Sequence, residues 1–174
     1  MSDDVYGGIV LSGNPETPCA LAFLGDEVTT YTTTDDEEIV EIIEEHGPRF
    51  LAFANPIQGP DVDDGFRDGE EELVDEGYSF RPQAMHDADK LERTVFLRNT
   101  LKRTVMPEMI ECRPKITADI LDIQGDDDLE DFGIPVESIA SMREFEAVLA
   151  AITAQFYAED QYEDQGFIVP KELD

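Results

Sequence analysis

The feature that most constrains the fold is an apolar run near the start of the chain, residues 5–11, which ends at the turn Gly13-Asn14-Pro15. A run rich in β-branched and apolar residues is typical of a strand, and glycine and proline end it. Because the run is nearly continuous rather than alternating, we expect both faces of this strand to be covered. A strand covered on both faces is typical of the centre of an α/β sheet.

The segments that follow predict a hairpin and then a crossover. Residues 18–24 and 27–33 have strand composition, and Gly25-Asp26 between them is a hairpin turn. A capping box at residues 34–37 starts a helix that Gly47-Pro48 ends. The apolar residues 50–53 then form a short strand, which we expect to lie parallel to the first.

The second half of the chain is less regular at its start and helical at its end. Residues 57–82, and most clearly 59–82, contain scattered glycines and predict an irregular loop region with a short helix at 70–74. Next come a helix over 87–105, a strand over 109–112, a helical turn at 119–123, an acidic loop at 126–128 and a helix over 141–157. From residue 159 we expect an acidic, mobile tail, in which Phe167-Ile168-Val169 offers a docking segment.

This order of elements predicts one domain over residues 1–174, of the α/β class. A hairpin start followed by crossovers is the order of a ribonuclease-H-like domain. Such a domain has a five-stranded mixed sheet in which strands one to three form an antiparallel meander, strands four and five run parallel to strand one, and helices cover both faces.

Charge is the unusual property of the composition. The chain carries 42 acidic and 12 basic residues, a net charge of −30. We interpret the acids as a solvated coat, for which a halophilic cytosol is the simplest setting, because concentrated salt screens their repulsion. We expect a cytoplasmic protein, because there is neither a signal peptide nor an apolar run that could span a membrane. Cys19 and Cys112 are expected to be free buried thiols.

Four short motifs, in order along the chain, carry a resemblance to a known family. The sequence resembles the predicted nucleases of the ribonuclease-H-like fold grouped as domain of unknown function 429. The matching segments are Gly8-Ile9-Val10-Leu11-Ser12-Gly13, Ala52-Phe53-Ala54-Asn55-Pro56-Ile57, Glu111-Cys112-Arg113-Pro114 and residues 145–154. Between the second and third of these, Arg67, Glu70, Leu73 and Gly77 resemble the family's next segment.

The departures from the family pattern fall at the implied active site. The resemblance implies four carboxylates that bind two Mg²⁺ or Mn²⁺ ions and activate a water. The first two positions are Val10 and Ala54, which cannot bind a cation, and Glu111 and Glu146 occupy the other two. A hard divalent ion held by two carboxylates keeps most of its water and binds weakly. We therefore predict that two-metal catalysis is lost or severely reduced.

Positive charge gathers in one window. Residues 81–115 hold eight of the twelve basic residues against five acids, a local balance of +3. These bases either neutralise neighbouring acids or form a surface that contacts phosphate or a partner. The candidates for such contacts are Arg93, Arg98, Lys102, Arg103 and Arg113.

Three hypotheses about function stay open. The first is a binding or regulatory module that has lost its nuclease site. The second is an atypical metal-dependent phosphodiesterase that uses Glu111, Glu146 and a loop ligand with Mg²⁺ or Mn²⁺. The third is an interaction protein that forms a homodimer. The net charge disfavours nucleic acid as a partner, because phosphate is repelled and counterion release contributes little at high salt.

Overall fold

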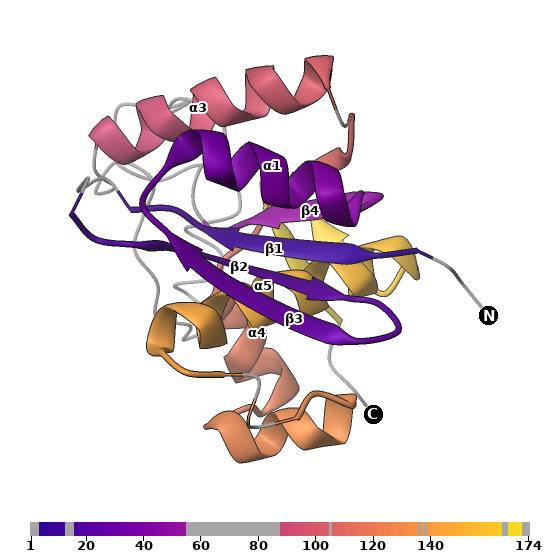
Figure 1. Ribbon diagram of the computed structural model, residues 1–174. Coiled ribbons are helices and arrows are strands. Elements are labelled where there is room, and N and C mark those ends of the chain that lie inside the picture. Colours follow the sequence, from indigo (N-terminus) through magenta and orange to yellow (C-terminus); the bar gives the residue numbers. More distant parts are fainter. Residues whose placement is uncertain are drawn as a thin grey trace.

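In the computed structural model, the protein folds into a mixed five-stranded sheet with helices on both faces (Figure 1). The structure describes residues 4–12, 16–54, 88–104, 106–135, 137, 139–164 and 167–171. The strand order is β3-β2-β1-β4-β5. The strands are β1 (Tyr6–Val10), β2 (Cys19–Leu24), β3 (Val28–Thr33), β4 (Phe50–Phe53) and β5 (Glu108–Glu111). The predicted loop at 57–82 and its short helix lie outside the described residues.

The strand directions confirm the predicted topology. β1 pairs antiparallel with β2, and β2 with β3, around the Gly25-Asp26 turn. β1, β4 and β5 are mutually parallel. The carboxyl ends of these three strands therefore meet at the same edge of the sheet, where the predicted site positions follow.

Helices α1 (Asp36–His46) and α3 (Ala88–Arg103) cover one face of the sheet (Figure 1). Ile39 of α1 and Leu97 of α3 share an apolar cluster with Ile9 of the central strand. The N-cap of α1 is Asp35, whose carboxylate accepts from the Glu37 amide at 3.0 Å, one residue later than the capping box predicted.

Helix α5 (Met142–Ala158) covers the other face, and Ser141 caps its first turn. The Ser141 hydroxyl accepts from the Glu144 amide at 3.2 Å and donates to its carboxylate at 3.0 Å. The helix lies very close to β1, because a Cβ at Gly8 would fall 2.1 Å from the Ala147 carbonyl oxygen. A glycine on the strand and alanines on the helix allow this approach.

Three predictions for the last third of the chain were wrong or incomplete. The helical turn at 119–123 is a longer helix that starts earlier, α4 (Pro114–Leu121). The acidic loop at 126–128 is a 3₁₀ helix, η2 (Asp126–Phe132), which buries Leu129. The expected tail contains β6 (Tyr162–Asp164) and β7 (Ile168–Pro170), and Phe167, Ile168 and Val169 are buried, so the docking segment is confirmed. Across the described residues we find no helix with the length and apolarity required to cross a bilayer.

Both thiols should be unreactive in the folded protein. Cys19 and Cys112 are free and fully buried, and burial raises the pKa of the Cys112 thiol to about 12. The thiol therefore stays protonated at neutral and mildly alkaline pH, and the reactive thiolate does not form. An aromatic disulfide reagent at pH 8 should detect no thiol in the native protein and both thiols after unfolding. Rapid reaction of either thiol in the native state would contradict this burial.

Candidate functional site

Two of the predicted site positions lie side by side at the carboxyl ends of β1 and β4. The Ala54 amide donates to the Ile9 carbonyl at 2.9 Å, and Ile9 pairs with Phe53, so the next pair along is Val10 and Ala54. Val10 is only 4% exposed and shares an apolar cluster with Ala147 of α5. The apolar side chain of Val10 therefore fills the space between the end of β1 and helix α5.

The fourth position, Glu146, lies in the first turns of α5 near the same strand ends. Ala147 and Ala151 contact Gly8, whereas Gln155, further along the helix, lines a pocket with Tyr6 at the start of β1. The helix thus runs antiparallel to β1, and its amino end approaches the carboxyl ends of the strands. Glu146 is half-buried there and directly precedes Ala147.

Glu111 lies on the opposite face of the sheet. Successive side chains on a strand point to opposite faces. Ile110 and Cys112 pack in a cluster with Ala150 of α5, whereas Met109 packs in the cluster under α1 and α3. Glu111 alternates with Ile110 and Cys112, so its side chain leaves the sheet on the side of Met109. The structure brings Val10, Ala54 and the start of α5 together, and it places Glu111 across the sheet from Glu146.

Glu111 is buried with its own cation. Its Oε2 lies 3.1 Å from Nη2 of Arg113, and the two side chains are 4% and 5% exposed. The Arg113 Nη1 donates to the Cys112 carbonyl at 3.0 Å, and the guanidinium lies over the Phe167 ring, 4.6 Å from its centroid. The ion pair neutralises a carboxylate that the family resemblance implies to be a metal ligand. The spacing of two residues on a strand is the sequence signal for this pair, because it puts both side chains on one face.

The basic candidates divide into buried and exposed side chains. Arg93 is held within the fold: it lies 2.6 Å from the Asp36 carboxylate and donates to the carbonyls of Ser12 and Thr34 at 2.8 and 3.1 Å. This network joins α3 to the end of β1 and the start of α1, so Arg93 is engaged internally rather than turned toward a phosphate. Arg113 is buried as described above.

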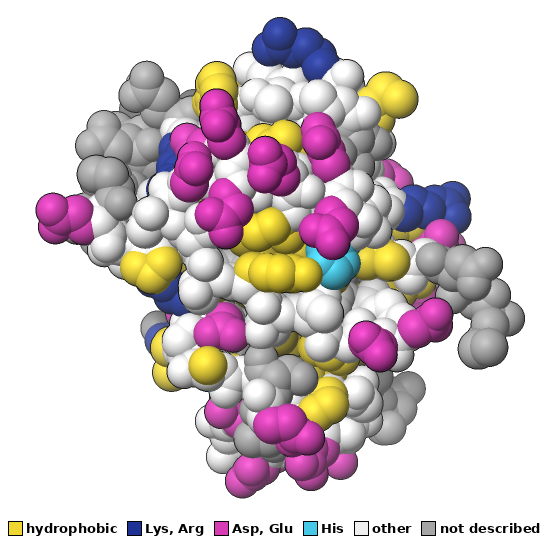
Figure 2. Space-filling view, in the orientation of Figure 1, with side chains coloured by type: hydrophobic (Ala, Val, Ile, Leu, Met, Phe, Trp, Pro, Cys, Tyr) yellow, Lys and Arg dark blue, Asp and Glu magenta, His cyan; other side chains and the backbone are white. Residues whose placement is uncertain are grey.

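The remaining basic candidates lie on α3. Arg98 is half-buried, and Lys102 and Arg103 are exposed in its last turn. Figure 2 shows that acidic side chains predominate on the face that α1 presents. A continuous basic surface for a phosphate backbone is therefore not formed on that face.

The side chains at the four implied positions do not supply the ligands of a two-cation site. Val10 and Ala54 have no donor atoms, and Glu111 is paired with Arg113 on the other face. Within the described ranges, no three His, Cys, Asp or Glu side chains are placed to hold one metal ion. Of the four implied positions, Glu146 is the one that combines a carboxylate with a place near these two strand ends, and one carboxylate does not bind Mg²⁺ or Mn²⁺ tightly.

Comparison with known proteins identifies the architecture. The chain is similar in structure to Thermus thermophilus RuvC solved in complex with a Holliday junction substrate, with a TM-score of 0.57, 12% identity and coverage of 96% of this chain and 99% of that one. The fold is ribonuclease-H-like. A second structure of Thermus thermophilus RuvC gives a TM-score of 0.56, 13% identity and coverage of 95% and 99%.

Sequence comparison does not assign the chain to a family. No family model matches the chain, and no curated protein does. The identity to RuvC is too low to transfer an activity, so the ribonuclease-H-like similarity describes the fold alone. Membership of the domain of unknown function 429 family stays a prediction from the four motifs.

Proposed function

We propose that this protein is a ribonuclease-H-like module without nuclease activity, and that it serves a binding or regulatory role. The observation that carries the proposal is the pair Val10 and Ala54, hydrocarbon side chains at the adjacent carboxyl ends of β1 and β4. A ribonuclease-H-like site needs oxygen ligands at strand ends to hold its metal ions. The burial of Val10 against α5 supports a packed structural role for this position.

A protein or small-molecule partner agrees with the charge better than nucleic acid does. The net charge of −30 repels phosphate. Arg93 and Arg113, two of the five basic candidates, are engaged inside the fold. We place the protein in the cytoplasm of a halophile as part of this proposal, where concentrated salt screens the acidic coat.

A nuclease assay tests the proposal. The protein is incubated with single-stranded DNA, duplex DNA and a four-way junction, in low and high salt, with Mg²⁺ or Mn²⁺ or with chelator. The junction is included because one structural neighbour was solved with a Holliday junction substrate. We expect no cleavage that depends on the metal ion. Metal-dependent cleavage that disappears in Glu146→Gln or Glu111→Gln would show a working atypical phosphodiesterase and overturn the proposal.

A further inference from the structure

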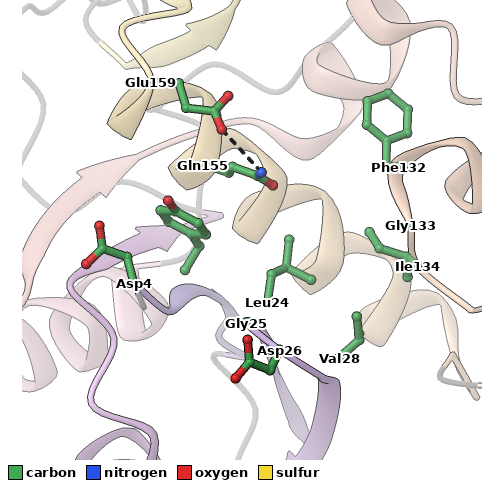
Figure 3. A pocket seen from close by; sticks show the side chains of 11 residues that line it. Asp4, Leu24, Gly25, Asp26, Val28, Phe132, Gly133, Ile134, Gln155 and Glu159 are labelled. Carbon is green, nitrogen blue, oxygen red and sulfur yellow. Dashed lines mark hydrogen bonds between the residues drawn. The ribbon is translucent and has the colours of Figure 1, made fainter. Parts of the chain in front are cut away.

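A pocket of about 340 Å³ lies at the other end of the sheet from Val10 and Ala54. It is formed where the start of β1, the β2–β3 turn, the end of η2 and the end of α5 meet (Figure 3). The volume lies in the range of small-molecule sites. None of the sequence motifs points to it, because its walls come from four separate segments of the chain.

One wall of the pocket is apolar. Leu24, Val28 and Ile134 group there, and Phe132 lies beyond them (Figure 3). The ring of Tyr6 also lines the space. Leu24 and Ile134 are 8% and 2% exposed and belong to the cluster under α5, so this wall is anchored in the core. A wall of this kind accommodates an alkyl chain.

The rest of the lining is acidic. Figure 3 shows the carboxylates of Asp4, Asp26 and Glu159 around the pocket, with Asp26 and Glu159 on opposite sides of it. No Lys, Arg or His is among the lining residues that the structure describes. Asp4 lies 3.3 Å from Arg49, whose side chain is 68% exposed, and Glu159 accepts a long 3.4 Å bond from Gln155. The contact of Glu159 is exposed and therefore weak, and the binding proposed below does not involve Asp4, which is engaged with Arg49.

The apolar wall and the acidic lining of the pocket together favour one class of ligand. Carboxylates exclude an anion, and an apolar wall offers nothing to a small inorganic cation, which needs oxygen on several sides. We propose that the pocket binds an alkylammonium group, with the ammonium beside Asp26 and the alkyl chain against Leu24, Val28 and Ile134. This pocket is separate from the carboxyl ends of β1 and β4. The proposed ligand therefore does not depend on the proposed absence of nuclease activity.

Calorimetric titration with cadaverine tests the site, with pentanediol of the same chain length as the neutral control. Because the acidic coat also attracts amines, Asp26→Asn is compared with Asp119→Asn, which removes the same charge from an exposed position of α4 outside the pocket. We expect cadaverine to bind the wild type and Asp119→Asn alike, Asp26→Asn to bind at least about tenfold more weakly, and pentanediol not to bind.

A second titration separates two sources of the ammonium group. N-acetyl-lysine methylamide presents the same group as a lysine of a partner protein would. Binding of this amide and of cadaverine supports a partner's lysine as the source, and binding of cadaverine alone supports a free polyamine. Equal weakening by Asp26→Asn and Asp119→Asn would show attraction to the acidic coat only and overturn the proposal, as would no binding of either amine.

Discussion

Gly8→Ala should destabilise the protein by more than about 3 kcal/mol, one of the largest effects expected of a single added methyl group. The added Cβ would lie 2.1 Å from the Ala147 carbonyl oxygen, 2.5 Å from the Ala151 amide nitrogen and 2.9 Å from the Ala150 Cβ. Backbone atoms of a helix cannot rotate away, so α5 must move off the sheet. Urea unfolding at fixed salt measures the loss.

The control for this prediction is Gly125→Ala. A Cβ there meets nothing within 4 Å, and the backbone is extended, with φ −169°. We expect a change in the free energy of unfolding within about 0.5 kcal/mol of zero, as is usual for surface substitutions. If Gly8→Ala were as mild as Gly125→Ala, α5 would not rest on β1 as described, and the position of Glu146 would have to be revised.

Arg113→Met should cost about 3–5 kcal/mol, because it leaves the Glu111 carboxylate charged and buried without its cation. The two side chains are 5% and 4% exposed, so water cannot replace the guanidinium. Methionine keeps an unbranched apolar stem of similar reach against Phe167. The comparison is a double-mutant cycle with Glu111→Gln, measured by urea unfolding at one salt concentration.

The double variant Glu111→Gln/Arg113→Met should be more stable than the sum of the single losses predicts, because no unpaired charge is left inside. The coupling free energy is expected to exceed about 1 kcal/mol. Additive losses would show that the two side chains do not interact across their 3.1 Å contact. Glu111 would then again be a candidate metal ligand.

Local sequence signals were sufficient to predict most of the sheet and its helices. The Gly25-Asp26 turn fixes the hairpin, the acids near Asp36 start α1, and Ser141 starts α5. The prediction of α4 failed because it began at residue 119 and overlooked a helix start at Pro114, directly after the strand. Proline also suits the first position of a helix, where its missing N–H is not needed, and the helix indeed begins at Pro114.

The candidate site could be predicted only in part. The sequence shows hydrocarbon side chains, Val10 and Ala54, at two positions where the family resemblance implies ligands, and the parallel strands that place them side by side follow from the order of elements. The face on which Glu111 lies depends on the register of β5, which a four-residue strand does not specify by itself. The pocket at Asp26 and Glu159 depends on four segments that meet only in the folded chain.

The central claim is that the ends of β1 and β4 no longer hold metal ions. The most direct measurement is an anomalous difference map at the manganese edge, from crystals soaked in Mn²⁺. We predict no peak within coordination distance, about 2.1–2.6 Å, of the Glu146 or Glu111 carboxylate. An ordered ion bound by Glu146 beside Val10 and Ala54, or by Glu111 in place of Arg113, would contradict the account.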